Sequence, residues 1–214
     1  MKKNDLISTI LNILVAVLGT IGLVIAIKEN INLMEFYTED SNILALVVSL
    51  IYAIFMLIKK DRELLPKWIV VLRYVATCCL ALTFIVVITV LSLLSYDNYF
   101  EGLIHLTTSG SMLYHHLLCP VISIISFIFF EGDRRLNKKK TIYYAIIPTF
   151  IYGLIMIILN LLKVEEGPYP FLMVYNQAFY MSIIWIIVIY LVDYLISRYI
   201  LLFNQINAPH IRKK

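Results

Sequence analysis

Six long apolar stretches follow one another along the chain, separated by short segments that collect most of the charged residues. The stretches cover residues 6–27, 42–58, 69–94, 112–130, 141–162 and 178–203. Most of them approach the roughly 20 residues that an α-helix needs to cross the hydrocarbon core of a bilayer. Segments of about ten alternating residues, typical of outer-membrane barrels, do not occur in this sequence. Because lipid offers no partner for open backbone groups, the pattern predicts an all-α integral membrane bundle of six transmembrane helices, forming one domain over residues 1–214.

The composition supports a membrane protein. Hydrophobic residues make up 61% of the chain and charged residues 15%, against about 45 to 50% and about 25% in soluble globular proteins. Such a chain cannot cover itself with polar surface. The first stretch exceeds the apolar region of a secretory signal peptide, about 7 to 15 residues, and no small-residue cleavage motif follows it. We therefore expect this stretch to remain as an uncleaved anchor.

The distribution of lysine and arginine predicts the orientation in the membrane. These residues gather before the first stretch and after the second, fourth and sixth: Lys2, Lys3, Lys59, Lys60, Arg62, Lys67, Arg134, Arg135, Lys138, Lys139, Lys140, Arg212, Lys213 and Lys214. Cytoplasmic loops carry such an excess, so we expect a multi-pass protein of the cell membrane with both termini cytoplasmic. The net charge of +4 then reflects topology and contact with anionic lipids, and we expect no nucleic-acid partner.

Charge is costly within the apolar stretches, so a charged residue there needs an explanation. Arg73 lies near the start of the third stretch and Asp193 near the end of the sixth, so their depths match. We interpret them as a structural ion pair between two helices. The alternatives are that Arg73 extends to the interface, or that the two residues form a charge relay or a transport coupling site.

Two consecutive histidines, His115 and His116, lie near the outer end of the fourth stretch. On an α-helix their side chains point about 100° apart, so we expect at most one to face the bundle centre. Pro120 cannot donate to the carbonyl of His116, which predicts a bend and a polar pocket. The alternative is a histidine pair at the membrane interface.

A group of polar residues precedes the second stretch at the same predicted depth as the histidines. Thr38, Ser41 and Asn42 belong to this group. Ser41, Asn42 and the neighbouring Asp40 are good helix N-cap residues, which is one explanation of them. A hydroxyl and an imidazole at one depth also indicate nucleophilic catalysis, because a threonine needs an adjacent base and histidine has a pKa near 6.5.

Three short motifs resemble a known family in order and spacing. They are Phe36-Tyr37-Thr38, His115 with Pro120 five residues later, and Tyr169-Pro170-Phe171-Leu172. Together they resemble the androgen-induced-protein family of multi-pass membrane hydrolases, of which we expect this chain to be a bacterial relative. The resemblance implies six helices and cleavage of fatty acid esters of hydroxy fatty acids.

The same resemblance implies the catalytic residues. Thr38 matches the family's nucleophilic threonine and His115 its histidine. The implied mechanism is attack by Thr38 on a lipid ester carbonyl, with His115 as base and then acid, followed by release of an acyl-threonine intermediate by water. His116 is a rival base, Ser41 is a rival nucleophile, and Asn42 is a possible supporting residue.

Two other functions stay open at this point. A metal-dependent membrane hydrolase would use His115 and Cys119, four residues apart, with Glu101 and His105 at the same spacing. A small-solute carrier or a non-catalytic lipid-binding protein would depend on the charges within the stretches. For the leading hypothesis, a threonine-dependent lipid ester hydrolase, we expect membrane lipids as partners, a fatty acyl ester as substrate, and neither a cofactor nor a metal.

Overall fold

Six helices in the computed structural model are long and apolar enough to cross a membrane. The structure describes residues 1–136 and 138–208, the side chain of residue 138 excepted, and this part contains no strand. The six helices are Lys3–Lys28, Tyr37–Lys59, Lys67–Leu94, Leu113–Phe130, Lys139–Leu161 and Phe179–Ile206. Their positions confirm the predicted all-α, multi-pass fold, because an unbroken apolar run can satisfy its backbone in lipid only by forming a helix.

Two of the six spans contain π-helical segments. The third joins α3 (Lys67–Val86), the π segment η2 (Val87–Leu91) and α4 (Ser92–Leu94). The fourth joins the π segment η3 (Leu113–Leu118), α6 (Cys119–Ile125) and a second π segment, η4 (Ser126–Phe130). The other spans are α1 (Lys3–Lys28), α2 (Tyr37–Lys59), α7 (Lys138–Leu161) and α8 (Phe179–Ile206). Such π segments occur often at functional sites.

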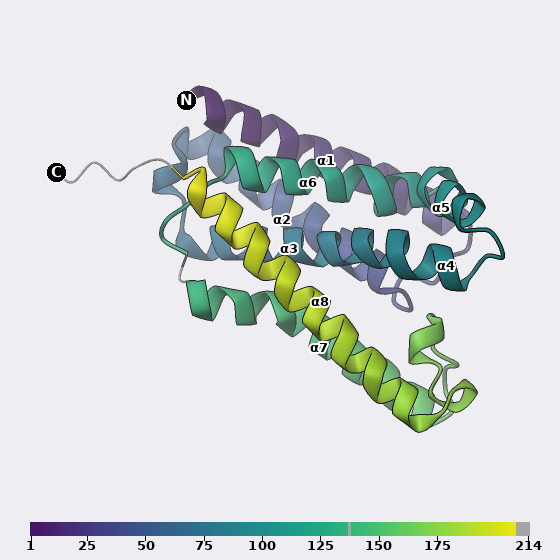
Figure 1. The fold of residues 1–214 in the computed structure, drawn as a ribbon. Coiled ribbons are helices and arrows are strands. Elements are labelled where there is room, and N and C mark those ends of the chain that lie inside the picture. The colour runs from purple at the N-terminus through teal and green to yellow at the C-terminus, as the bar shows by residue number, and fades with distance from the viewer. Residues whose placement is uncertain (137, 209–214) are drawn as a thin grey trace.

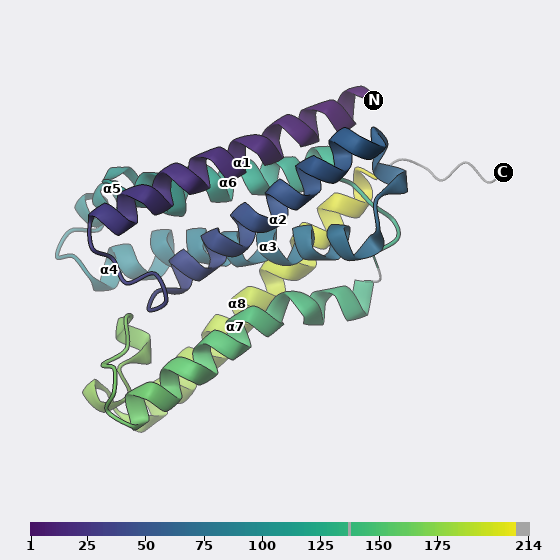
Figure 2. The ribbon, with the colours of Figure 1, turned by 180° about the vertical axis from the view of Figure 1, so that it is seen from behind.

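The spans divide into a compact bundle and a diverging pair (Figures 1 and 2). α1, α2, α3 and the fourth span pack together, and α7 and α8 pack on each other and on α3. Toward one end of the molecule α7 and α8 diverge from the bundle. The loop that joins them, with the short turns η5 (Pro170–Leu172) and η6 (Val174–Asn176), lies at this end.

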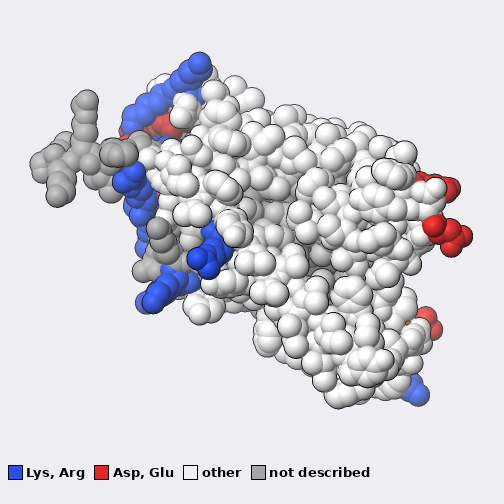
Figure 3. Space-filling view, in the orientation of Figure 1, with Lys and Arg blue, Asp and Glu red and all other residues white. Residues whose placement is uncertain are grey.

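Charged residues distinguish the two ends of the molecule. On the face shown in Figure 3, lysine and arginine concentrate at the end where the chain begins, and acidic residues dominate at the other end. We call these the basic end and the acidic end. α8 ends at the basic end, the same end of the molecule at which α1 begins (Figure 1). The predicted basic residues Arg212, Lys213 and Lys214 and the side chain of Lys138 lie outside the described part.

The segments before the second and fourth spans contain more helix than the apolar stretches alone predict. α2 begins at Tyr37 and not at residue 42, with Phe36 at its N-cap position, so the expected N-cap role of Ser41 and Asn42 was wrong. Between the third and fourth spans, the helix α5 (Tyr99–Thr108) begins after Asn98, whose side chain accepts a hydrogen bond from the backbone of Phe100. Both helices place backbone groups close to the histidines.

The predicted ion pair between Arg73 and Asp193 was wrong. Arg73 is completely buried and donates to both carboxylate oxygens of Glu131, at 2.9 and 3.1 Å. Its neighbour Tyr74 donates to the carbonyl of Ser197 on α8. Since consecutive side chains on a helix point about 100° apart, α3 directs Tyr74 toward α8 and Arg73 away from it, toward the fourth span.

Candidate functional site

Thr38 and His116 meet at the acidic end of the bundle. Thr38 lies in the first turn of α2 and His116 in η3. The hydroxyl oxygen of Thr38 lies 3.3 Å from Nε2 of His116. Only 6% of Thr38 and 8% of His116 are exposed. The hydroxyl and the imidazole are therefore in hydrogen-bond contact in a site shielded by the protein.

The second nitrogen of His116 determines the tautomer of its ring. Nδ1 lies 2.6 Å from the backbone carbonyl oxygen of Leu106. A carbonyl only accepts hydrogen bonds, so Nδ1 carries a proton, and in the neutral ring Nε2 is left as an acceptor. Leu106 lies in the last turn of α5, where carbonyl groups lack partners within the helix. The end of α5 thus orients His116 with its basic nitrogen toward Thr38.

His115 contacts different groups. Its Nδ1 lies 2.9 and 3.1 Å from the two carboxylate oxygens of Glu39, and its Nε2 lies 3.5 Å from the carbonyl oxygen of Gly19. Only 1% of His115 is exposed. Both histidines are therefore inside the bundle, and the expectation that at most one would face it was wrong. The ring that hydrogen-bonds with Thr38 is that of His116, the rival in the sequence analysis, and not that of His115.

The π segment explains the placement of two adjacent histidines. Hydrogen bonds in a π-helix join residues five apart, as between the N–H of Cys119 and the carbonyl of Tyr114. In this pattern the carbonyl of His115 faces residue 120, and Pro120 has no N–H to donate to it. In an α-helix the carbonyl of His116 would be the one without a donor. The side-chain amide of Asn42 supplies the donor, at 3.1 Å.

Asn42 also joins the histidine segment to the helix that carries Thr38. Its amide nitrogen donates to the carbonyl of Thr38 at 2.8 Å as well as to the carbonyl of His115. Asn42 is 2% exposed, so shortening this side chain would take a donor from the carbonyl of His115 in a nearly dry environment. The sequence analysis named Asn42 only as a possible supporting residue, and the structure gives it these two contacts.

Ser41, the rival nucleophile, contacts other groups. Its hydroxyl donates to the carbonyl of Thr38 at 2.9 Å and lies 3.0 Å from the hydroxyl of Thr83. Neither partner can act as a general base at neutral pH. Of these two hydroxyl groups, the one in contact with a histidine is that of Thr38.

Tyr169 was not among the predicted site residues, although it lies in the Tyr-Pro-Phe-Leu motif. Its hydroxyl oxygen lies 3.4 Å from the backbone nitrogen of Thr38 and 3.5 Å from the Thr38 hydroxyl oxygen. Burial raises the pKa of Tyr169 to about 12, so its hydroxyl is neutral at physiological pH. The motif signalled this residue, but spacing along the chain could not show that it folds back onto α2.

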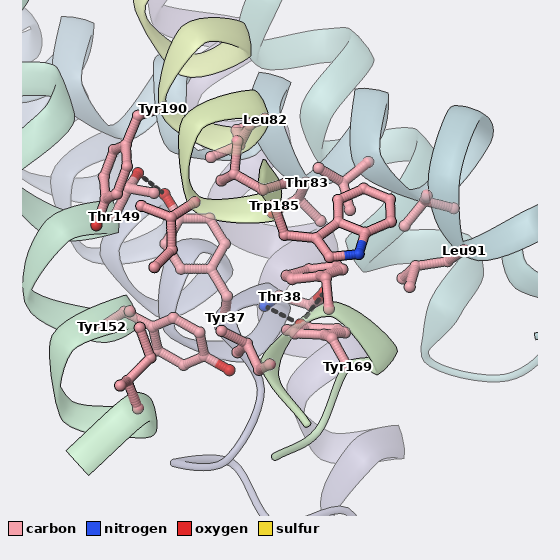
Figure 4. A pocket seen from close by; sticks show the side chains of 18 residues that line it. Tyr37, Thr38, Leu82, Thr83, Leu91, Thr149, Tyr152, Tyr169, Trp185 and Tyr190 are labelled. Atoms are coloured by element: carbon pink, nitrogen blue, oxygen red, sulfur yellow. Dashed lines mark hydrogen bonds between the residues drawn. The ribbon is translucent and has the colours of Figure 1, made fainter. Parts of the chain in front are cut away.

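An apolar pocket opens beside Thr38. It lies between α2, α3, α7, α8 and η5, and its volume is about 690 Å³ with open solvent included. Leu82, Trp185 and Ile189 belong to its mainly apolar and aromatic wall, of which Thr38 and Tyr169 also form part (Figure 4). The pocket suits an apolar chain with a polar group placed at Thr38.

The residues of the metal hypothesis have other partners. The thiol of Cys119 points to the carbonyl of Val15, and His105 pairs with the hydroxyl of Tyr96 at 2.8 Å. No group of three or more His, Cys, Asp or Glu side chains with metal-binding geometry occurs within residues 1–136 and 138–208. The structure therefore does not bring these predicted residues together.

Comparisons with models of protein families, with curated proteins and with solved structures found no match.

Proposed function

We propose that this protein is a lipid ester hydrolase of the cell membrane, with Thr38 as nucleophile and His116 as general base. The observation that carries the proposal is the contact between the Thr38 hydroxyl and Nε2 of His116, with Nδ1 of the same ring held by a carbonyl. The proposal keeps the resemblance to the androgen-induced-protein family but transfers the histidine's role from His115 to its neighbour.

The chemistry proceeds in two halves. In the first, Nε2 of His116 takes the hydroxyl proton while Thr38 Oγ1 bonds to the ester carbonyl carbon, and the π electrons of the carbonyl move to its oxygen. The carbonyl then re-forms, the bond to the alkoxy oxygen breaks, and His116 returns the proton to that oxygen. In the second half a water molecule attacks the acyl-threonine, with His116 again as base and then acid, and releases a carboxylic acid and free Thr38.

The pocket indicates the substrate class. Its apolar wall favours a fatty acyl chain, and Thr38 in that wall places the nucleophile where the chain ends in a carbonyl. Since basic loops prefer the cytoplasm, we assign the basic end to the cytoplasmic side, with both termini there. The site then lies beneath the outer membrane surface, at the depth where ester groups of lipids and water meet.

Hydrolysis of a fluorogenic long-chain acyl ester and labelling by a fluorophosphonate probe test the assignment. Thr38→Ala is expected to abolish both, because no other hydroxyl described in the site contacts a histidine. Ser41→Ala is the matched control: it removes a buried hydroxyl three residues away and is expected to keep labelling. Labelling of the Thr38 variant at the wild-type rate would refute the nucleophile.

A further inference from the structure

The phenol of Tyr169 is held against the backbone of Thr38 by its aromatic neighbours. Its ring stacks on Phe171, with centroids 5.2 Å apart and planes 10° apart, and meets Phe36 edge to face at 6.1 Å. Tyr169 is 6% exposed and forms part of the pocket wall together with Thr38. The hydroxyl group is thus fixed at the point where the pocket meets the nucleophile (Figure 4).

The donors around Thr38 can be assigned from the partners present. The hydroxyl proton of Thr38 goes to Nε2 of His116, whose other nitrogen is already protonated. The backbone N–H of Thr38 donates to the Tyr169 oxygen at 3.4 Å. This N–H belongs to the first turn of α2, where backbone donors have no partner within the helix. Tyr169 therefore accepts from the N–H, and its own proton remains available to the Thr38 oxygen or to a ligand beside it.

We propose that the Tyr169 hydroxyl and the Thr38 backbone N–H together form the oxyanion hole of the acyl transfer proposed above. When Thr38 Oγ1 bonds to the carbonyl carbon, the π electron pair moves to the carbonyl oxygen. This oxygen becomes an oxyanion next to both donors. The O–H of Tyr169 donates to this oxygen, and the Thr38 N–H, which the first turn of α2 holds in place, donates to it as well as to Tyr169. No proton is transferred to it, and both hydrogen bonds weaken when the carbonyl re-forms and the alkoxy group leaves.

The environment of Tyr169 suits a donor and not a proton source. The neutral phenol keeps its proton at physiological pH, so it offers a hydrogen bond without adding a negative charge beside the oxyanion. Fixed donors in a site shielded from water stabilise a developing charge without reorganising at the moment of reaction. Loss of one oxyanion-hole donor typically lowers kcat by about 10² to 10³-fold.

Tyr169→Phe tests this role, because it removes the hydroxyl and keeps the ring that packs on Phe171. We expect kcat for the fluorogenic acyl ester to fall about 10² to 10³-fold, with KM changed only a few-fold. Tyr74→Phe is the matched control: Tyr74 is likewise a buried tyrosine, but its hydroxyl donates to the carbonyl of Ser197 and it does not line the pocket. Rates are expressed per folded molecule, counted by stoichiometric binding of a fluorescent fatty acid.

A second measurement separates an oxyanion donor from a packing residue. A long-chain alkyl trifluoromethyl ketone forms a tetrahedral adduct with a nucleophilic hydroxyl and carries an oxyanion, whereas the fluorescent fatty acid does not. Tyr169→Phe should weaken inhibition by the ketone at least about 30-fold and leave fatty-acid affinity within a few-fold. Equal loss of both affinities, or a kcat within three-fold of wild type while Thr38→Ala is inactive, would overturn the role of Tyr169. Activity retained in Thr38→Ala would instead overturn the hydrolase itself.

Discussion

The two adjacent histidines differ because their partners differ. The acceptor at Nδ1 of His116 is an uncharged carbonyl, which favours a neutral ring whose Nε2 is free to accept a proton. The acceptor on Nδ1 of His115 is a carboxylate, and its second nitrogen faces another carbonyl. Both ring nitrogens of His115 face acceptors on other helices of the bundle. His115 is thus suited to holding Glu39 and α1 in place, and His116 to exchanging a proton.

The same substitution at the two positions tests this division. His116→Gln should lower kcat/KM by about 10² to 10⁴-fold, the usual contribution of a general base. His115→Gln should keep at least a tenth of the activity per folded molecule, because an amide can still donate to Glu39. Hydrolysis of the fluorogenic acyl ester measures both variants. A larger loss at position 115 than at position 116 would return the base to His115.

Sequence reasoning named a group of residues that contact one another in the structure, but it could not tell which of them pair. Thr38 could be named because a hydroxyl and a histidine share one depth when their helices run in the same direction. His115 was preferred over His116 because the resemblance implied it, and α-helical spacing predicted only that at most one of the two rings faces the bundle, whereas the structure has a π segment there. Tyr169 reaches the site through the path of a loop, which spacing does not determine. These features depend on tertiary contacts and not on local sequence.

At the scale of the elements, the position of η3 depends on the close approach of α1 at Gly22. A methyl group added at Gly22 would lie 2.6 Å from Cδ2 of His115 and 2.8 Å from Cβ of Tyr114. Real side chains do not tolerate such distances, so the absence of a side chain at Gly22 is what allows α1 and η3 to pack. The same helix has Gly19 one turn earlier, where an added methyl group would meet Leu46 at 3.5 Å, an ordinary contact.

Gly22→Ala should therefore displace η3 and lower stability by about 1 to 3 kcal/mol, the usual cost of overpacking. It should also lower hydrolytic activity, because η3 carries His116. Gly19→Ala is the matched control in the same helix, and it should be neutral or slightly stabilising, since alanine is favoured over glycine in helices by about 0.5 to 1 kcal/mol. Thermal unfolding in detergent and ester hydrolysis measure both effects. Equal behaviour of the two variants would contradict this packing.

At the scale of the whole molecule, the two ends of the bundle have different polar interiors. The acidic end holds the candidate site, and the basic end holds the pair of Arg73 and Glu131. Ser49 and Ser123 accept further hydrogen bonds from Arg73, and Asn12 donates to Glu131. Between the two clusters lie small apolar side chains, among them Ala45, Ala76 and Cys119. The bundle formed by α1, α2, α3 and the fourth span is thus fixed at both ends by polar contacts between helices.

The fold was largely predictable because the apolar length of each span directly reflects the thickness of a bilayer. The partner of Arg73 could not be predicted in the same way. Glu131 lies just beyond the fourth apolar stretch, where the sequence suggests a loop residue. Asp193, the expected partner, was chosen by depth alone. Depth does not determine which face of a helix a residue occupies, and α3 turns Arg73 toward the fourth span. To predict which side chains pair across the bundle, one therefore also needs the rotation of each helix about its axis.

Substitution of the two acidic residues distinguishes the pair observed from the pair expected. Glu131→Gln leaves the buried guanidinium of Arg73 without a compensating charge, and breaking a buried pair in this way costs about 3 to 5 kcal/mol. Asp193→Asn keeps the shape of a side chain whose partners are the hydroxyl groups of Ser197 and Thr149, so its cost should stay below about 1 kcal/mol. For a chain of this size, Glu131→Gln should lower the Tm in detergent by on the order of 10 °C, against a few degrees for Asp193→Asn. A larger fall for Asp193→Asn would show that the charge on α8, and not the one after the fourth span, stabilises the bundle.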